Sequence, residues 1–313
     1  MTQFSRNKMI LAKIEGTYGT DPTPVEASNA ITTKNLTRQV YGGNTVSRDL
    51  DLPTMGNDEL INTGPIVQLS FDVELAGNAA AGVAPHYGEL LRACGLGETI
   101  VAVTSVTYAH VSTAFESVTI YYNYDGEQQV IVGARGTFSL GMSKEGIPMI
   151  SFQFTGIYAR PTAVAMYDPT YTDVTPQPFN DTNTTTFSVH GQAVQGTAFN
   201  YDAGQDVVYR NLPGSTSVQI VDRAPAGSVT FEAVPIATKD FFAATESHAG
   251  SISLAAISIV HGSGAGNIAT ISIPTCQLTN ISEPDDDKIR HMQIPFRAIP
   301  TDAGDDEFSL AFT

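Results

Sequence analysis

The sequence contains little cysteine, no tryptophan and few basic residues. Cys94 and Cys276 are the two cysteines among 313 residues. We therefore expect no disulfide framework, and both thiols should be buried like small hydrophobic groups. Sixteen Lys and Arg residues stand against 32 Asp and Glu residues, for a net charge of −16. Affinity for nucleic acid comes from cationic contacts with phosphates, so this composition argues against tight binding of DNA. An acidic protein can still surround DNA without adhering to it.

Long hydrophobic runs are also lacking. No segment approaches the roughly 18 consecutive apolar residues of a membrane helix, so we expect no membrane insertion. Residues 1–16 contain no apolar run that ends in a small-residue cleavage site, and we expect no secretory signal. The sequence thus favours an internal site of action.

Signatures of catalysis and metal binding are missing as well. There is no G-x-S-x-G, H-E-x-x-H, paired C-x-x-C or P-loop motif. The acidic clusters at 283–287 and 302–307 lack the alternating ligands and closing Glu of a calcium loop, so we interpret them as solvated loops. The histidines are scattered without metal-ligand spacing and are expected to be structural: His86, His110, His190, His248, His261 and His291. We predict no enzyme, no cofactor and no metal site.

An internal repeat is the most informative feature that is present. Residues 59–75 align without a gap against residues 219–235, which places Phe71 on Phe231 at an offset of 160 residues. Later in each half, residues 147–157 resemble residues 290–299. Several similarities in the same order predict a duplicated module.

The local patterns favour short strands. Residues 67–75 alternate apolar and polar side chains, as in a half-buried strand. Two hairpins are expected, over residues 117–140 with a turn at Asp125-Gly126 and over residues 251–274 with a glycine-rich turn. Short amphipathic helices are expected at residues 84–95 and 237–247, the second capped by Thr238 with Phe241 and Phe242 facing the core.

These elements predict a mainly β fold. We expect two tandem duplicated modules, each a β-sandwich or partly open barrel with one short α-helix. The first module comprises residues 1–163, a Pro-, Asp- and Thr-rich linker comprises residues 164–182, and the second module comprises residues 183–313.

Residues 41–64 stand out as a long segment that we interpret as irregular, with a counterpart at residues 200–222. Irregular loops of this length are uncommon unless they bind something. A mobile surface loop is the alternative, but Leu50, Leu52 and Met55 are apolar residues that a fully solvated loop does not require. We therefore expect a contact loop.

An ordered set of segments resembles the tail tube proteins of long-tailed bacteriophages. It comprises residues 8–24, 85–95, 115–126, 133–140, 147–162, 207–212, 222–233 and 237–243. The similarity is closest to the double-module type of siphophages and Mu-like prophages. It implies a β-sandwich whose inner sheet joins those of neighbouring subunits in a hollow ring. Three double-module chains would make a trimeric ring with pseudo-sixfold symmetry.

The resemblance also implies sites and partners. The segment 41–64 is similar to the loop that stacks one ring on the next, and its candidate contact residues are Arg48, Asp49, Leu50, Leu52, Pro53 and Met55. The implied partners are further copies of the chain, a tape-measure protein, terminator or tip proteins, and DNA that passes without tight binding. The implied location is the virion of a non-contractile tail, assembled in the bacterial cytoplasm.

A virion decoration or receptor-binding module is the alternative function. It would be favoured if Tyr121, Tyr122 and Tyr124, near a hairpin tip, were exposed. We expect alternation to bury some of them and to leave the rest at an interface. A β-sandwich hydrolase is a third possibility, but it would require a catalytic cluster that the sequence does not show.

Overall fold

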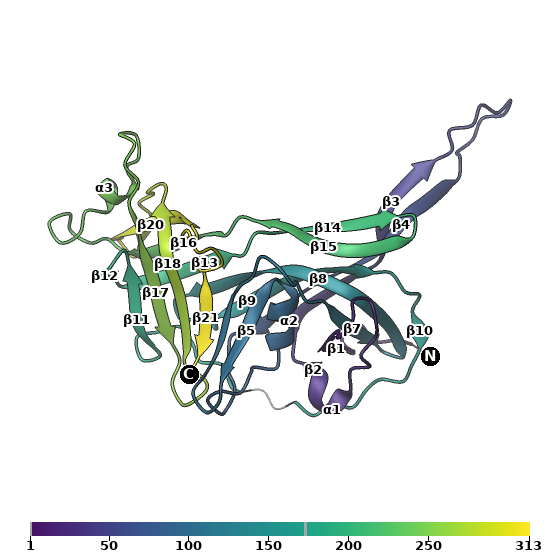
Figure 1. Ribbon diagram of the computed structural model, residues 1–313, viewed down its shortest axis with the longest axis horizontal. Coiled ribbons are helices and arrows are strands. Elements are labelled where there is room, and N and C mark those ends of the chain that lie inside the picture. The colour runs from purple at the N-terminus through teal and green to yellow at the C-terminus, as the bar shows by residue number, and fades with distance from the viewer. Residues whose placement is uncertain (1, 172–173) are drawn as a thin grey trace.

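The computed structural model describes residues 2–171 and 174–313 and is dominated by β-strands (Figure 1). The strands of the first half are β1 (Lys8–Ile14), β2 (Ala30–Ile31), β3 (Lys34–Ser47), β4 (Leu60–Glu74), β5 (Leu96–Val101), β6 (Ser105–His110), β7 (Val118–Tyr124), β8 (Glu127–Ser143), β9 (Met149–Ile157) and β10 (Thr162–Ala163). Those of the second half are β11 (Thr184–Val189), β12 (Gln192–Ala193), β13 (Gly196–Asp202), β14 (Gln205–Leu212), β15 (Ser215–Arg223), β16 (Ala226–Glu232), β17 (Leu254–His261), β18 (Ala269–Leu278), β19 (Asp285–Asp286), β20 (Ile289–Ala298) and β21 (Ser309–Phe312). The prediction of a mainly β fold is confirmed.

The helices are short: α1 (Glu26–Asn29), α2 (Gly88–Ala93) and α3 (Phe241–Thr245). The two expected helices are α2 and α3, whereas the single turn of α1 was not expected. The prediction that Thr238 caps the second helix is wrong. Asp240 is the cap, because its carboxylate accepts a hydrogen bond from the Ala243 amide at 2.9 Å. Phe241 is buried as expected, and Phe242 is half-buried.

Alternating burial along the strands places the core mainly on one face of the sheet. In β4, Val67, Leu69, Phe71 and Val73 are buried, as predicted, and Leu75 follows them. Alternation also runs through β9, the C-terminal parts of β13, β16 and β20, and the end of β8, whereas residues 133–136 in the middle of β8 are all buried. Their apolar faces meet in one core, whereas the opposite face carries mostly hydroxyl, amide and acidic side chains.

The two halves order their strands in the same way. Pairing in the first half runs β1–β7–β8–β9–β4–β3, and pairing in the second runs β11–β17–β18–β20–β16–β13. Both expected hairpins are present as β7–β8 and β17–β18, and Asp125 and Gly126 have the positive φ angles of the predicted turn. Phe71 lies opposite Phe152, and its repeat counterpart Phe231 lies opposite Met292.

Strand β8 joins the halves. Its first part pairs with β7, and its last part, Ser139–Ser143, pairs with β13 of the second half. The C-terminal strand β21 returns to pair with both β18 and β6. Rings from both halves also pack together, with Tyr201 stacked on Phe308 and both next to Phe138. The halves therefore share one hydrophobic core.

The segment expected as a linker is docked over much of its length. Met166 and Tyr167 pack on a small cluster on the outer face of β1 and β7, and Phe179 enters the main core. Residues 172–173 of this segment lie outside the described residues. The sheet formed by the described residues does not close into a barrel.

The prediction that residues 41–64 are irregular is largely wrong. They form the outer half of the β3–β4 hairpin, and residues 48–59 alone lie between its strands. The counterpart at 200–222 is likewise mostly strand, as the β14–β15 hairpin turns at Pro213 and Gly214. A two-stranded arm satisfies its backbone groups by pairing while both faces stay exposed. It therefore lacks the apolar alternation that predicts a half-buried strand.

Candidate assembly site

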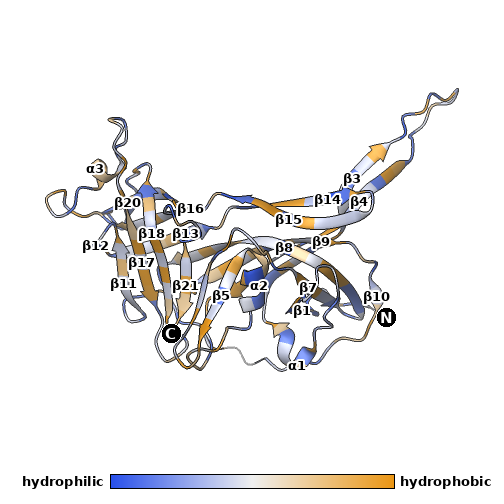
Figure 2. Ribbon diagram, viewed as in Figure 1, coloured by the Kyte–Doolittle hydropathy of each residue, from blue (hydrophilic) through white to orange (hydrophobic). Residues whose placement is uncertain are grey.

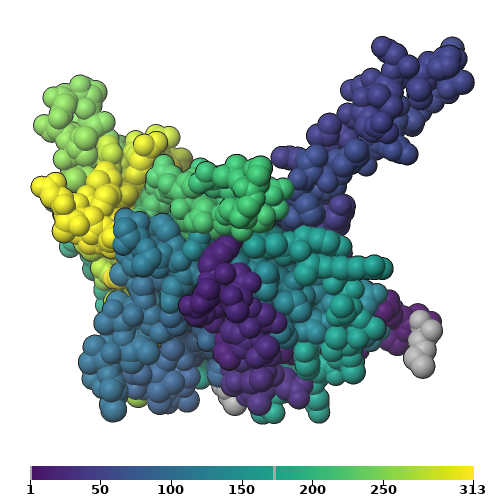
Figure 3. Space-filling view, turned by 45° about the vertical axis from the view of Figure 1, so that its right-hand side comes forward, coloured from purple at the N-terminus to yellow at the C-terminus, as the bar shows by residue number. Residues whose placement is uncertain are grey.

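The β3–β4 hairpin projects from the body of the molecule as an arm, which we define as residues 43–64 (Figures 1 and 3). Gly43 and Gly64 mark its base. Gly43 has φ +111°, and a Cβ atom there would lie 2.0 Å from the Gly64 carbonyl oxygen. The close crossing of the two strands therefore requires glycine. Beyond this point the arm is held by its own backbone pairing and leaves the sheet.

The second hairpin buttresses the base of the arm. The Asn211 side chain of β14 donates a hydrogen bond to the Thr63 carbonyl at 2.9 Å, and Tyr209 packs beside Gly64. Figure 1 shows β14 and β15 lying along β8 and reaching toward the arm. The second half thus helps to fix the direction in which the arm of the first half points.

Short-range hydrogen bonds shape the tip, residues 48–59. Asp49 adopts φ +42° and accepts from the Ser47 hydroxyl at 2.7 Å. Asp58 accepts from the Leu50 amide at 2.8 Å, and Arg48 lies 3.7 Å from Glu59. These polar contacts satisfy hydrogen-bonding groups of the turn, and the apolar side chains of the tip stay exposed.

All six predicted contact residues lie in this tip: Arg48, Asp49, Leu50, Leu52, Pro53 and Met55. Leu50 is 46% exposed, Leu52 is 60% exposed and Met55 is fully exposed. Val46, Leu60 and Ile61, on the flanking strands, add exposed apolar surface that was not predicted from the sequence. Figure 2 shows apolar stretches in the outer parts of β3 and β4. Their apolar character was visible in the sequence, but nothing local distinguished a strand that faces a core from one that faces solvent. A concentrated apolar surface on a projecting arm is typical of an interaction site.

The polar face of the sheet is continuous across both halves. One row of paired residues runs through Asp72, Ser151, Ser139 and Asp202, and ends at Arg297. The Ser151 hydroxyl donates to the Asp72 carboxylate at 2.6 Å. This face presents mainly hydroxyl, amide and carboxylate groups to solvent, which gives it little capacity to hold a polyanion.

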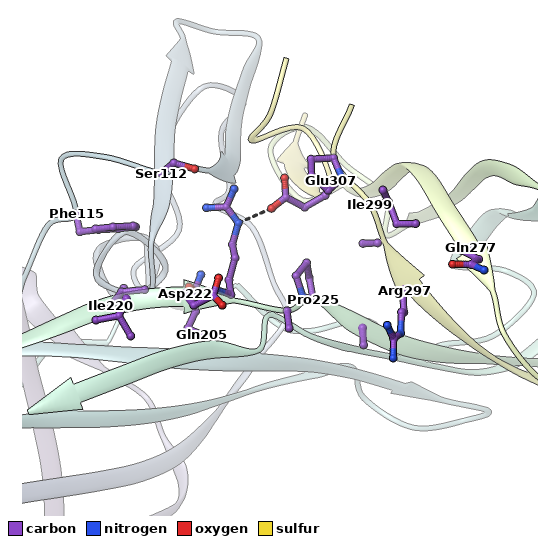
Figure 4. A pocket seen from close by; sticks show the side chains of 16 residues that line it. Ser112, Phe115, Gln205, Ile220, Asp222, Pro225, Gln277, Arg297, Ile299 and Glu307 are labelled. Atoms are coloured by element: carbon purple, nitrogen blue, oxygen red, sulfur yellow. Dashed lines mark hydrogen bonds and ion pairs between the residues drawn. The ribbon is translucent and has the colours of Figure 1, made fainter. Parts of the chain in front are cut away.

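A cleft of about 740 Å³ lies where the halves meet (Figure 4). Arg223 of β15 crosses it to bind the buried Glu307 carboxylate, Asp305 at 2.5 Å and the Val111 carbonyl at 2.8 Å. The guanidinium pairs with both carboxylates and joins the C-terminal segment to the first half. We interpret this cluster as a structural junction, since each charge has an opposite partner.

A buried histidine lies in the same junction. The His110 ring contacts the Tyr201 hydroxyl at 2.8 Å. Burial lowers the pKa of His110 to about 3, and the nearby Arg223 charge acts in the same direction. The imidazole is therefore neutral in the folded protein at physiological pH.

Both cysteine side chains are buried. Burial raises the pKa of Cys94 well above its usual range and that of Cys276 to about 12, so neither thiol is activated. His190 lies 3.6 Å from the Cys276 sulfur, but burial lowers its pKa. Among residues 2–171 and 174–313, no three His, Cys, Asp or Glu side chains gather as a metal site. None of the helices in the described part of the chain is long and apolar enough to span a membrane.

The tyrosines considered for receptor binding are not an exposed patch. Tyr121 and Tyr122 are buried on opposite faces of β7, and Tyr124 is half-buried. Arg38 covers the Tyr122 ring at 4.2 Å from its centroid. The expectation that the fold buries some of these rings is confirmed.

No curated protein matches the chain significantly. One family model, described as phage tail tube protein, matches residues 5–313, nearly the entire chain. A match of this extent is sufficient to assign the family, and the chain belongs to the phage tail tube proteins.

Proposed function

We propose that this protein is the major structural subunit of a phage tail tube, without enzymatic activity. In this proposal three chains form a ring with pseudo-sixfold symmetry, and rings stack into a hollow tube that conducts DNA into the host. The observation that carries it is the family match over residues 5–313, together with an apolar arm that the single chain leaves exposed.

The pseudo-sixfold ring rests on a tandem duplication. Its support is the equal strand order of the two halves and the offset of 160 residues that relates Phe71 to Phe231. Two similar modules joined side by side through β8 and β13 would form one third of a six-module ring. In this proposal the modules comprise residues 1–163 and 183–313, and the docked segment between them is the connection.

The arm supplies the contact between rings. Leu50, Leu52 and Met55 would be buried against the neighbouring ring, and Arg48, Asp49 and Pro53 would shape the surrounding polar rim. A head-to-tail contact of this kind does not close on itself, so it generates a filament.

The polar face of the sheet would line the channel. Asp72, Glu74, Asp202 and Glu232 lie on this face, among serine, threonine and glutamine side chains. Like-charge repulsion would keep DNA from adhering to the wall during transit.

The partners and location follow from this role. The lumen would hold a tape-measure protein during assembly in the bacterial cytoplasm, and terminator and tip proteins would contact the two ends of the tube. The finished tube would belong to the virion of a non-contractile tail.

Electron microscopy of the purified protein at high concentration tests the proposal. We expect hollow rings whose mass equals three chains and whose end view shows six similar lobes. Particles that remain two-lobed single chains, even with tail-tip initiator present, would contradict it.

A further inference from the structure

The pairing of β8 with β13 inside the chain is a template for the contact between two chains. We infer that the outer edge of β3 in one subunit pairs with residues 282–287 of a second copy, as β13 pairs with β8 within the chain. This inference rests on the proposed ring and specifies its lateral contact.

The equivalence of β13 and β3 follows from their neighbours β16 and β4, which are counterparts in the repeat. Phe199 of β13 lies opposite Val229 of β16. The repeat counterpart of Val229 is Leu69 of β4, and Leu69 lies opposite Arg38 of β3. Asn200 lies opposite Ser228, and Gln68, the repeat counterpart of Ser228, lies opposite Gln39, so Asn200 corresponds to Gln39. Strand β3 therefore occupies in the first half the place that β13 occupies in the second.

The equivalence of β8 and residues 282–287 follows in the same way. In the first half, Leu140 lies opposite Ile150 of β9. Val73 lies opposite Ile150, and its repeat counterpart Ala233 donates a backbone hydrogen bond to Arg290 of β20 at 2.9 Å, so the structural counterpart of Ile150 is Arg290. This structural register differs by two residues from the sequence alignment of 147–157 with 290–299. Arg290 lies opposite Asp285. Gly141 thus corresponds to Asp286. Residues 282–287 continue the direction of β18 along β20. In the same way, the end of β8 continues along β9 beyond the part that pairs with β7.

Neither edge has a further strand partner in the part of the chain that the structure describes, but two carbonyls of β3 accept side-chain hydrogen bonds: Leu36 from Lys8, and Val40 from Gln129 at 3.2 Å. Within the described residues, β3 pairs with β4 alone, and β19 pairs with β20 alone. Ser282 exchanges both backbone hydrogen bonds with Gln293, at 2.8 and 3.0 Å. Alternation then directs the N–H and C=O groups of Glu283 and Asp285 to the opposite side, which is the free edge. Pro284 does not block this edge, because its missing N–H falls on the β20 side.

The two edges carry opposite charge. Residues 283–287 include four exposed carboxylates, from Glu283, Asp285, Asp286 and Asp287. Within the chain, Glu283 pairs with Arg290 and Asp286 lies 3.5 Å from the Lys144 ammonium, so Asp285 and Asp287 carry the charge that no ion pair among the described residues offsets. The β3 edge carries the exposed Lys34 and the half-buried Arg38, and Lys8 lies beside it through a hydrogen bond to the Leu36 carbonyl. Opposite charges bring the two edges together and disfavour pairing of like edges.

Strand β13 at the internal junction and strand β3 at the free edge carry different side chains. At the internal junction, β13 presents Phe199 and Tyr201, which are fully buried. At the free edge, β3 presents Arg38 together with Val40 and Tyr41, which are 37% and 53% exposed. The covalent junction can rely on a dry core, whereas a contact between separate chains must keep each chain soluble until assembly.

A designed disulfide tests the predicted register. Asn200 and Gly141 face each other in the internal junction, so Gln39 and Asp286 of neighbouring chains should do so in the ring. A pair that shares no backbone hydrogen bonds places its Cα atoms about 4.5 Å apart, which suits a disulfide. Oxidised Q39C/D286C should therefore run as a covalent species of up to three chains on a non-reducing gel. The buried Cys94 and Cys276 should not interfere.

Three controls make the result specific. Q39C and D286C alone should stay monomeric on the gel, and so should Q39C/S282C, whose cysteines would be displaced by roughly 13 Å along the strand. If wild-type rings are seen by microscopy but Q39C/D286C does not cross-link, the lateral contact is wrong while the ring proposal stands. If no rings form under any condition, the ring proposal itself fails.

A proline variant tests the backbone pairing separately from charge. Glu283→Pro removes an N–H that points to the free edge and leaves the hydrogen bonds between Ser282 and Gln293 in place. We expect it to fold with an unchanged circular dichroism spectrum but to lose rings at least tenfold. Glu283→Gln removes the charge and keeps the N–H, so it should form rings. Normal ring yield from the proline variant would overturn the inference.

Discussion

Replacing Leu50 and Leu52 by aspartate should separate stacking from folding. Leu50 is 46% exposed and Leu52 is 60% exposed, so their combined exposed surface is about that of one fully exposed leucine. Burying one leucine contributes ~1.5–3 kcal/mol, so three arms in a trimeric ring would contribute roughly 5–9 kcal/mol to each ring junction. The change should therefore weaken stacking at least about a thousandfold.

The same change should leave the isolated chain intact. Both leucines are exposed and contribute little to the core, so the free energy of unfolding should change by no more than about 0.5 kcal/mol. Sedimentation and negative-stain microscopy should show rings without tubes. A matched control, V103D/I252D, adds the same charges at exposed apolar positions away from the arm and should keep its tubes. Tubes of normal length from L50D/L52D would refute the stacking role of the arm.

Three further predictions concern the junction. Because the folded pKa of His110 is about 3, protonation of this histidine in the unfolded chain should lower the free energy of unfolding as the pH falls below about 6.5, by about 2 kcal/mol at pH 5. Urea titrations at both pH values should show this loss in the wild type and not in H110Q. Arg223→Met should cost about 3–5 kcal/mol, because Glu307 stays buried without its cation, and adding E307Q should restore part of the loss. Phe138→Ala should cost about 3–5 kcal/mol in one cooperative thermal transition, and two separated transitions would contradict a shared core.

The sequence alone determined the features that depend on local pattern. Alternation from residue 67 to residue 75 placed the β4 core face correctly, and Asp125-Gly126 predicted its turn, because strand period and turn chemistry act over a few residues. The apolar residues in a long polar segment, together with the family resemblance, pointed to the arm. Local pattern failed at Thr238, where the nearby Asp240 formed the cap instead.

The tertiary structure alone decided what those segments contact. Strand pairing across the arm depends on backbone groups that every sequence carries, so composition could not distinguish a two-stranded arm from an irregular loop. Pairing of β8 with β13 and the ion cluster of Arg223 with Glu307 and Asp305 join residues far apart in the chain. Such contacts depend on the packed geometry of both halves, because the side chains that meet there show no local pattern that identifies their partners.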